Sequence, residues 1–86
     1  MEIDKIKSII EAILFAAGRQ VTIKELMISL EIPKEDLENI IVSMQEDYRE
    51  QSRGIEIIKV DDSYQLCTKK ELYEFLYPIL GKRSKP

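Results

Sequence analysis

Few side chains in this sequence have the types and spacing that catalysis or metal binding needs. The chain has no histidine and a single cysteine, Cys67, which excludes an imidazole base, a Cys–His pair and a zinc site of ordinary composition. Its three glycines form no phosphate-cradling loop. Asp61 and Asp62 could bind a cation, but two adjacent acids in an expected turn are more typical of a solvated turn. We therefore expect a protein that is not an enzyme and that uses no cofactor and no metal ion.

The charge distribution argues against nucleic-acid binding. The 86 residues, enough for one domain, carry 16 acidic and 13 basic side chains. Lys82, Arg83 and Lys85 stand in the last six positions, so the first 80 residues hold 16 acidic but only 10 basic side chains.

No apolar stretch approaches the roughly 20 residues of a membrane helix, and the N-terminus lacks the basic segment of a signal peptide. Cys67 is the only cysteine, so no internal disulfide can form, which fits a reducing cytoplasm, and we expect a cytoplasmic protein.

Apolar residues at helical spacing predict three helices in the first fifty residues. The first covers residues 4–17 and ends before Gly18, and the second covers about 23–30 after a Thr22–Glu25 capping box. The third covers about 34–50. The positions expected to face a core are Ile3, Ile6, Ile9, Ile10, Ile13, Leu14 and Ala17, then Ile23, Leu26, Met27 and Leu30, then Leu37, Ile40, Ile41, Met44 and Tyr48.

The periodicity changes from 3.6 to 2 after Gly54. Residues 55–60 and 64–68 are expected to form two strands joined by a turn, which makes a β-hairpin. A last helix is expected at 69–77, with Leu72, Phe75 and Leu76 facing inward and Pro78 breaking it or marking its last turn. Three helices followed by a hairpin is the order of a winged helix-turn-helix, so the expected fold class is mainly α with a small β-hairpin and an added C-terminal helix.

The third helix is acidic where a DNA-reading helix would be basic. A winged helix that reads DNA presents this helix to base edges and phosphates. Here Lys34 and Arg49 stand against six acidic residues, and the first turns present Glu35, Asp36 and Glu38. Repulsion from phosphates would dominate such a contact. We therefore predict a domain that binds proteins, and the alternative is a winged-helix DNA-binding transcriptional regulator.

Several apolar residues fall off the core stripes and are candidates for protein contacts. They lie on the polar sides of the three helices, on one of the two apolar faces of the hairpin, and in an i,i+4 tyrosine pair on the last helix. Each also has a plainer interpretation, because isolated exposed apolar residues are common and the last helix could cover some of them. The candidates are Phe15, Ile28, Val42, Ile57, Tyr73 and Tyr77.

Three segments of the chain resemble one protein family. They are Ile9–Gly18 (IIEAILFAAG), Val21–Leu26 (VTIKEL) and the hairpin between Arg53 and Lys69. The hairpin resembles the RGIEL…GYQLRTK hairpin of segregation and condensation protein B. The likeness covers nearly all of residues 5–80, and its specificity comes from three segments in the same order.

The resemblance also predicts how the chain is divided. Residues 1–80 would form an N-terminal winged-helix domain, and residues 81–86 a basic linker toward a second winged-helix domain that is absent from this chain. The sequence departs from the family in the hairpin, where Cys67 replaces an arginine and Asp61–Ser63 replaces a turn richer in glycine.

The resemblance implies a non-catalytic accessory subunit of a bacterial condensin-like SMC–kleisin complex, which acts in chromosome condensation and segregation. Members of this family form homodimers, to which the N-terminal domain contributes. They bind the kleisin subunit, segregation and condensation protein A, and reach the SMC protein through it. The family is cytoplasmic and joins the nucleoid through the complex, and ATP hydrolysis belongs to the SMC subunit.

Overall fold

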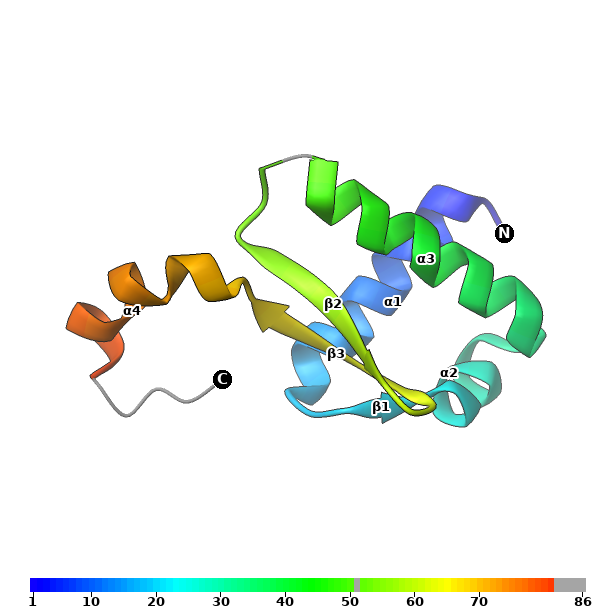
Figure 1. Ribbon diagram of the computed structural model, residues 1–86. Helices are drawn as coiled ribbons and strands as arrows, with labels where there is room; N and C mark the ends of the chain where they lie inside the picture. The colour runs from blue at the N-terminus through cyan, green and yellow to red at the C-terminus, as the bar shows by residue number, and fades with distance from the viewer. Residues whose placement is uncertain (51, 82–86) are drawn as a thin grey trace.

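A computed structural model describes residues 1–50 and 52–81, and its elements follow the predicted order (Figure 1). The basic linker predicted at 81–86 lies outside the described residues except for Gly81. The elements are α1 (Ile3–Ala17), β1 (Val21–Thr22), α2 (Ile23–Leu30), α3 (Lys34–Glu50), β2 (Ile55–Val60), β3 (Ser63–Thr68), the 3-10 turn η1 (Lys70–Leu72) and α4 (Tyr73–Leu80).

The predicted hairpin is confirmed, and the short strand β1 joins it to form a three-stranded antiparallel sheet of order β1-β3-β2. Val21 of β1 pairs with Tyr64, on the edge of β3 that faces away from β2. The backbone N–H of Ile23 donates to the Asp62 carbonyl at 2.8 Å, which ties the first residue of α2 to the hairpin turn. The wing is therefore held against the helices at its tip.

The core lies between α1, α2, α3 and the inner face of the sheet. The helix stripes predicted from the sequence supply most of it, and Val21, Ile57 and Tyr64 complete it from the strands. Ile3 is the exception on α1, because it begins the helix and is 52% exposed. Each fully buried aliphatic side chain contributes roughly 1.5–3 kcal/mol to folding. The five largest fully buried side chains are Ile10, Leu14, Leu26, Leu37 and Ile41.

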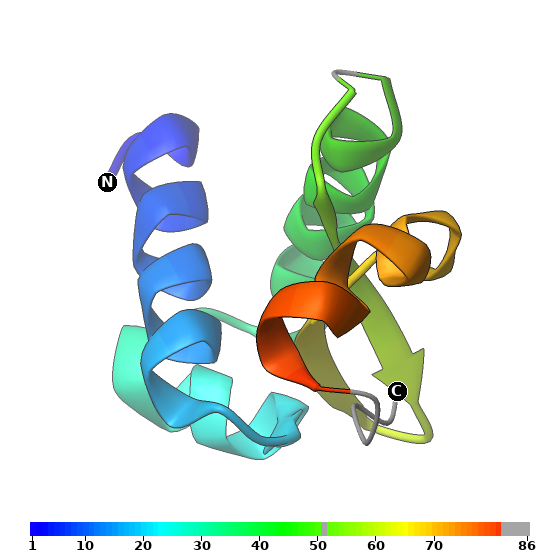
Figure 2. The same cartoon turned by 90° about the vertical axis from the view of Figure 1, so that its left-hand side faces the viewer.

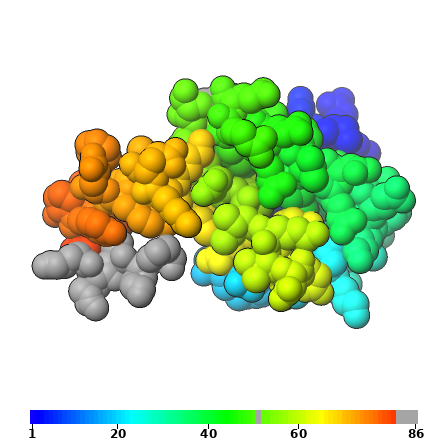
Figure 3. Space-filling view, viewed as in Figure 1, coloured from blue at the N-terminus to red at the C-terminus, as the bar shows by residue number. Residues whose placement is uncertain are grey.

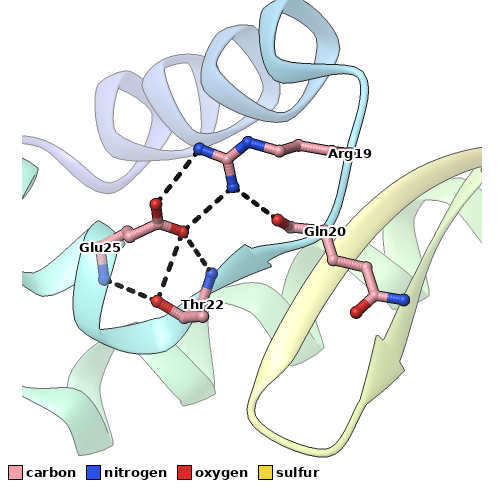
Figure 4. Close-up of polar contacts among 4 residues, drawn as sticks. All are labelled: Arg19, Gln20, Thr22 and Glu25. Atoms are coloured by element: carbon pink, nitrogen blue, oxygen red, sulfur yellow. Dashed lines mark hydrogen bonds and ion pairs between the residues drawn. The ribbon is translucent and has the colours of Figure 1, made fainter.

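Local signals place the ends of the first two helices. Gly18 takes a left-handed conformation (φ 62°), and its N–H bonds the Leu14 carbonyl to close α1. The predicted capping box is present at α2: the Glu25 N–H donates to the Thr22 hydroxyl at 3.1 Å, and the Thr22 N–H donates to the Glu25 carboxylate at 2.8 Å. Figure 4 shows Arg19 reaching across to the same carboxylate, with nitrogen–oxygen distances of 3.3 and 3.2 Å.

The C-terminal helix differs most from its prediction. Residues 70–72 form a 3-10 turn, and the α-helix runs through Pro78 as far as Leu80, where the Gly81 N–H bonds the Tyr77 carbonyl. Phe75, which we expected to face inward, is 64% exposed, and α4 has no buried side chain at all. Figures 1 and 2 show α4 leaving the open end of the hairpin, away from α2 and the hairpin turn. It forms a separate lobe at one end of the molecule (Figure 3).

Candidate protein-binding surfaces

The α3 surface is acidic in the structure as it is in the sequence. Glu35 and Asp36 are exposed in the first turn of the helix, and Glu38 is half-buried. An N-terminal turn of this kind stabilises its own helix, because acidic side chains compensate the positive end of the helix dipole. It also repels the phosphates that a DNA-reading helix must approach. The geometry therefore places negative charge where a DNA contact would need cations.

Three of the predicted contact residues lie open to solvent on three different helices. Phe15 on α1 is 79% exposed, Ile28 on α2 is 78% exposed, and Val42 on α3 is 50% exposed. The alternative that the last helix covers Phe15 is wrong, because α4 projects away and leaves it open. Tyr73 and Tyr77 come together on α4, with ring centroids 6.4 Å apart. The part that these residues play in binding stays a prediction.

The assignment of Ile57 to an outer surface is wrong. Its side chain is 4% exposed and belongs to the core, and its carbonyl accepts a hydrogen bond from the Gln45 side chain of α3 at 3.0 Å. Side chains alternate between the two faces of a strand. A prediction that is wrong by one residue therefore assigns every apolar side chain of the strand to the opposite face. The exposed apolar residues of β2 are Ile58 and Val60, at 36% and 39% exposed.

The sequence prediction also missed the apolar surface of α4. Phe75, Ile79 and Leu80 are 64%, 83% and 65% exposed. The sequence carried one signal for this surface. Ile79 and Leu80 are two large apolar residues that follow Pro78 and belong to no predicted core stripe. Pro78 has no N–H to donate to the Glu74 carbonyl, yet α4 continues past it to Leu80.

A shallow groove of about 330 Å³ runs between α1 and the hairpin. Residues 8, 11, 12 and 15 share one side of α1, because they recur at helical spacing opposite the core stripe. Ile55 of β2 and Leu66 of β3 form the other wall, and both are partly buried. We call this depression the α1 groove. Its lining is Ser8, Glu11, Ala12, Phe15, Ile55 and Leu66.

A polar depression continues the α1 groove toward the end of α3, and the two share Ser8 and Glu11. Tyr48 donates from its hydroxyl to the Glu11 carboxylate at 2.5 Å, and the Arg53 guanidinium lies 5.3 Å from the Tyr48 ring centroid. Burial, followed by the hydrogen bond to Glu11, raises the pKa of the Tyr48 hydroxyl. This tyrosine is therefore a neutral donor that joins α3 to α1 beside the groove.

The described residues offer little for chemistry. Within 1–50 and 52–81 there is no cluster of three metal-ligating side chains. Burial raises the pKa of the half-buried Cys67 thiol, so it stays protonated and weakly nucleophilic near neutral pH. None of the described helices combines the length and the hydropathy of a membrane-spanning segment.

Helices α1 to α3, the sheet and the wing define a winged-helix domain with an acidic third helix and uncovered apolar surface on several elements. The family model of the segregation and condensation complex subunit ScpB matches residues 8–86 of the chain. The chain belongs to this family, as the resemblance predicted.

The chain is similar to segregation and condensation protein B of two bacteria. It is 40% identical to the Clostridioides difficile protein over 87 residues, which cover 99% of this chain and 49% of the relative. It is also 40% identical to the Bacillus subtilis protein over 80 residues, which cover 92% of this chain and 41% of the relative. The chain thus spans about half the length of the curated relatives that it matches.

Two solved structures share the fold. The crystal structure of a dimer of an ScpB N-terminal domain, complexed with an ScpA peptide, matches with a TM-score of 0.85 and 30% identity, over 91% of this chain and 98% of that one. ScpB from Mycobacterium tuberculosis matches with a TM-score of 0.87, over all of this chain and 55% of that one. At 20% identity, the second likeness shows the fold alone.

Proposed function

We propose that this chain acts as a non-catalytic accessory module of a bacterial condensin-like SMC–kleisin complex in chromosome condensation and segregation. It works by forming a homodimer and by binding the kleisin, segregation and condensation protein A, in the cytoplasm. Residues 1–80 are the winged-helix domain that does this. The observation that carries the proposal is the likeness to a dimeric ScpB N-terminal domain holding an ScpA peptide, which extends over 98% of that chain.

Two apolar surfaces at opposite ends of the domain support a module with two partners. One comprises α4 and the α1 groove. The other is a groove of about 580 Å³ between the start of α1 and the α2–α3 connection, lined by apolar residues such as Ile3, Ile32 and Ile40. Glu31 and Asp36 are part of that lining, so it suits a peptide with apolar and basic side chains. Figure 1 shows this connection at the end opposite α4.

The experiment is a titration of the 86-residue chain with two probes, a synthetic kleisin peptide and a random-sequence DNA duplex. We expect saturable binding of the peptide by calorimetry and no retention of the duplex at low salt. Ile32→Glu should weaken peptide binding, and Val60→Glu, at an exposed apolar residue of β2 outside this groove, serves as the control. Binding of the duplex with an affinity that falls as salt rises, together with no peptide binding, would instead indicate a DNA-binding regulator.

A further inference from the structure

The helix α4 is apolar over more of its circumference than a surface helix needs. At 100° per residue, the apolar side chains from Phe75 round to Tyr77 span an arc of about 200°, and Glu74 and Pro78 occupy the remainder. A surface helix usually carries a stripe of about 100°, and an apolar surface twice as wide is typical of a helix that is covered on two sides. In this chain Tyr73 and Leu76 are half-buried, and the Phe75–Ile79 row has no cover.

The α1 groove is a complementary surface on the same molecule. Its floor and walls are mainly apolar, from Ala12, Phe15, Ile55 and Leu66. Phe15 stands 79% exposed beside it. An apolar helix and an apolar groove thus coexist on one chain, and each lacks a partner among the described residues.

The backbone directs α4 away from the groove of its own chain. After β3, the Lys69 N–H donates to the Gly54 carbonyl at 3.0 Å, and the Leu72 N–H donates to the Lys69 carbonyl at the same distance. The Lys69 ammonium also donates to the Tyr48 carbonyl at 2.9 Å. These bonds anchor the root of α4 to the end of α3 and the start of β2, and Figures 1 and 2 show the helix continuing outward.

We propose that α4 of one copy packs into the α1 groove of a second copy, and that the second copy returns the same contact. This inference rests on the proposed homodimerisation and assigns its surface. The Phe75–Ile79 row enters the partner's groove and contacts Phe15. Because the second copy returns the same contact, the pair closes on itself with two-fold symmetry and leaves neither surface open for chain growth.

The area available fits a dimer. An aromatic side chain buries about 150–250 Å². The exposed apolar side chains of α4, together with Phe15, therefore supply on the order of 600 Å² per copy, or about 1,200 Å² for the pair, which is the lower end of specific interfaces. The solved ScpB neighbour that matches this chain over nearly its whole length is itself a dimer.

Charge substitutions on the two halves of this contact test the proposal in the 86-residue chain. Phe75→Glu and Phe15→Glu should each raise the dimer dissociation constant about a hundredfold in sedimentation experiments, because a carboxylate would be buried in an apolar contact. Val60→Glu is the control, because Val60 is an exposed apolar residue of β2 that lies outside both α4 and the α1 groove. It should leave the dimer unchanged, and helical circular dichroism should be retained in all three.

Cross-linking distinguishes a second copy from closure within one chain. In a Cys67→Ser background, Ala12→Cys and Ile79→Cys are made in separate chains, mixed, and treated with a short bismaleimide. The proposal predicts a cross-linked heterodimer that appears only in the mixture. With both cysteines in one dilute chain, a fast cross-linked monomer would mean that α4 folds onto its own groove, which would overturn the proposal.

Each negative result identifies which of the two proposals is wrong. A wild-type dimer that survives both Phe75→Glu and Phe15→Glu would overturn the assigned surface and leave the proposed function standing. A wild-type monomer that binds the kleisin peptide would overturn the surface and the homodimer, but not the kleisin contact. A monomer that binds no peptide would overturn both proposals.

Discussion

At the scale of single residues, the Glu25 side chain bonds to residues of the loop between α1 and α2. Its carboxylate accepts from the Thr22 N–H and pairs with the Arg19 guanidinium, which also donates to the Gln20 carbonyl at 2.7 Å (Figure 4). The Arg19 contact first, and then the Thr22 backbone, lower the pKa of Glu25. One side chain therefore caps α2 and fixes the preceding loop.

Arg19→Met should raise the pKa of Glu25 toward its ordinary value, as measured by NMR titration of the carboxyl carbon. A carboxyl whose pKa is lowered by folding contributes stability above its unfolded pKa, and this contribution is lost as pH falls through the folded value. The wild-type chain should therefore lose more stability than Arg19→Met as pH falls through that window. An unchanged Glu25 pKa in Arg19→Met would show that the pair does not form in solution.

Tyr48 offers a second test, because two tyrosines of the core differ in their partners. Tyr48 donates to Glu11, but Tyr64, which is equally buried, makes no side-chain hydrogen bond among the described residues. Tyr48→Phe should cost about 1.5–3 kcal/mol in urea unfolding, the usual contribution of a hydrogen bond to a charged group, and Tyr64→Phe should cost much less. Equal losses would contradict the role assigned to the Tyr48–Glu11 bond.

The same bond sets a dependence on alkaline pH. Folding raises the pKa of Tyr48, so its contribution to stability is complete below the unfolded tyrosine pKa of about 10 and is lost as pH rises above it. Tyr48→Phe should therefore lose less stability than the wild-type chain when pH is raised above 10. The comparison requires only unfolding curves at two pH values.

At the scale of elements, α1 and α2 both end at a residue whose backbone has the left-handed conformation. Gly18 ends α1 at φ 62°, and Glu31 ends α2 at φ 57°. A residue with a side chain is strained in this region, and glycine is not. Gly18→Ala should destabilise the fold by about 1 kcal/mol, and Glu31→Gly should stabilise it by up to about 1 kcal/mol, as measured by chemical unfolding. The same sign in both variants would contradict the backbone assignment.

The helices and the hairpin could be predicted because each carries its own local signal. Gly18, the Thr22–Glu25 box and Pro33 mark helix ends, and a change in periodicity marks β2. The face of the hairpin was harder, because β2 has isoleucines on both faces and only packing against α3 decides that Ile57 is buried. The direction of α4 had no local signal, since hydrogen bonds between Lys69, Gly54 and Tyr48 set it.

The candidate surface was predictable only in part for the same reason. Phe15, Ile28 and Val42 could be found because a helix stripe fixes which side faces outward. The inward prediction for Phe75 assumed that the last helix packs on its own core. An apolar helix that stays open in the single chain cannot be told from a core helix by its sequence.

At the scale of the whole molecule, the shape is that of a core with a protruding helix. The principal extents are 41 × 23 × 20 Å, and α4 lies at one end of the long axis (Figure 3). Because α4 has no buried side chain, the core should not depend on it. Ile79→Glu should therefore leave the melting temperature of a dilute sample unchanged within about 4 °C, since surface substitutions shift stability by roughly 0.5 kcal/mol or less. A large loss would show that α4 belongs to the core of its own chain.

The central claim, that this chain is a self-associating protein-binding module, is tested most directly by its mass in solution across a concentration series, measured by light scattering. We expect a mass that rises with concentration to twice that of the 10.0 kDa chain and no further, because a two-fold contact closes on itself. A mass of one chain at every concentration would contradict the claim.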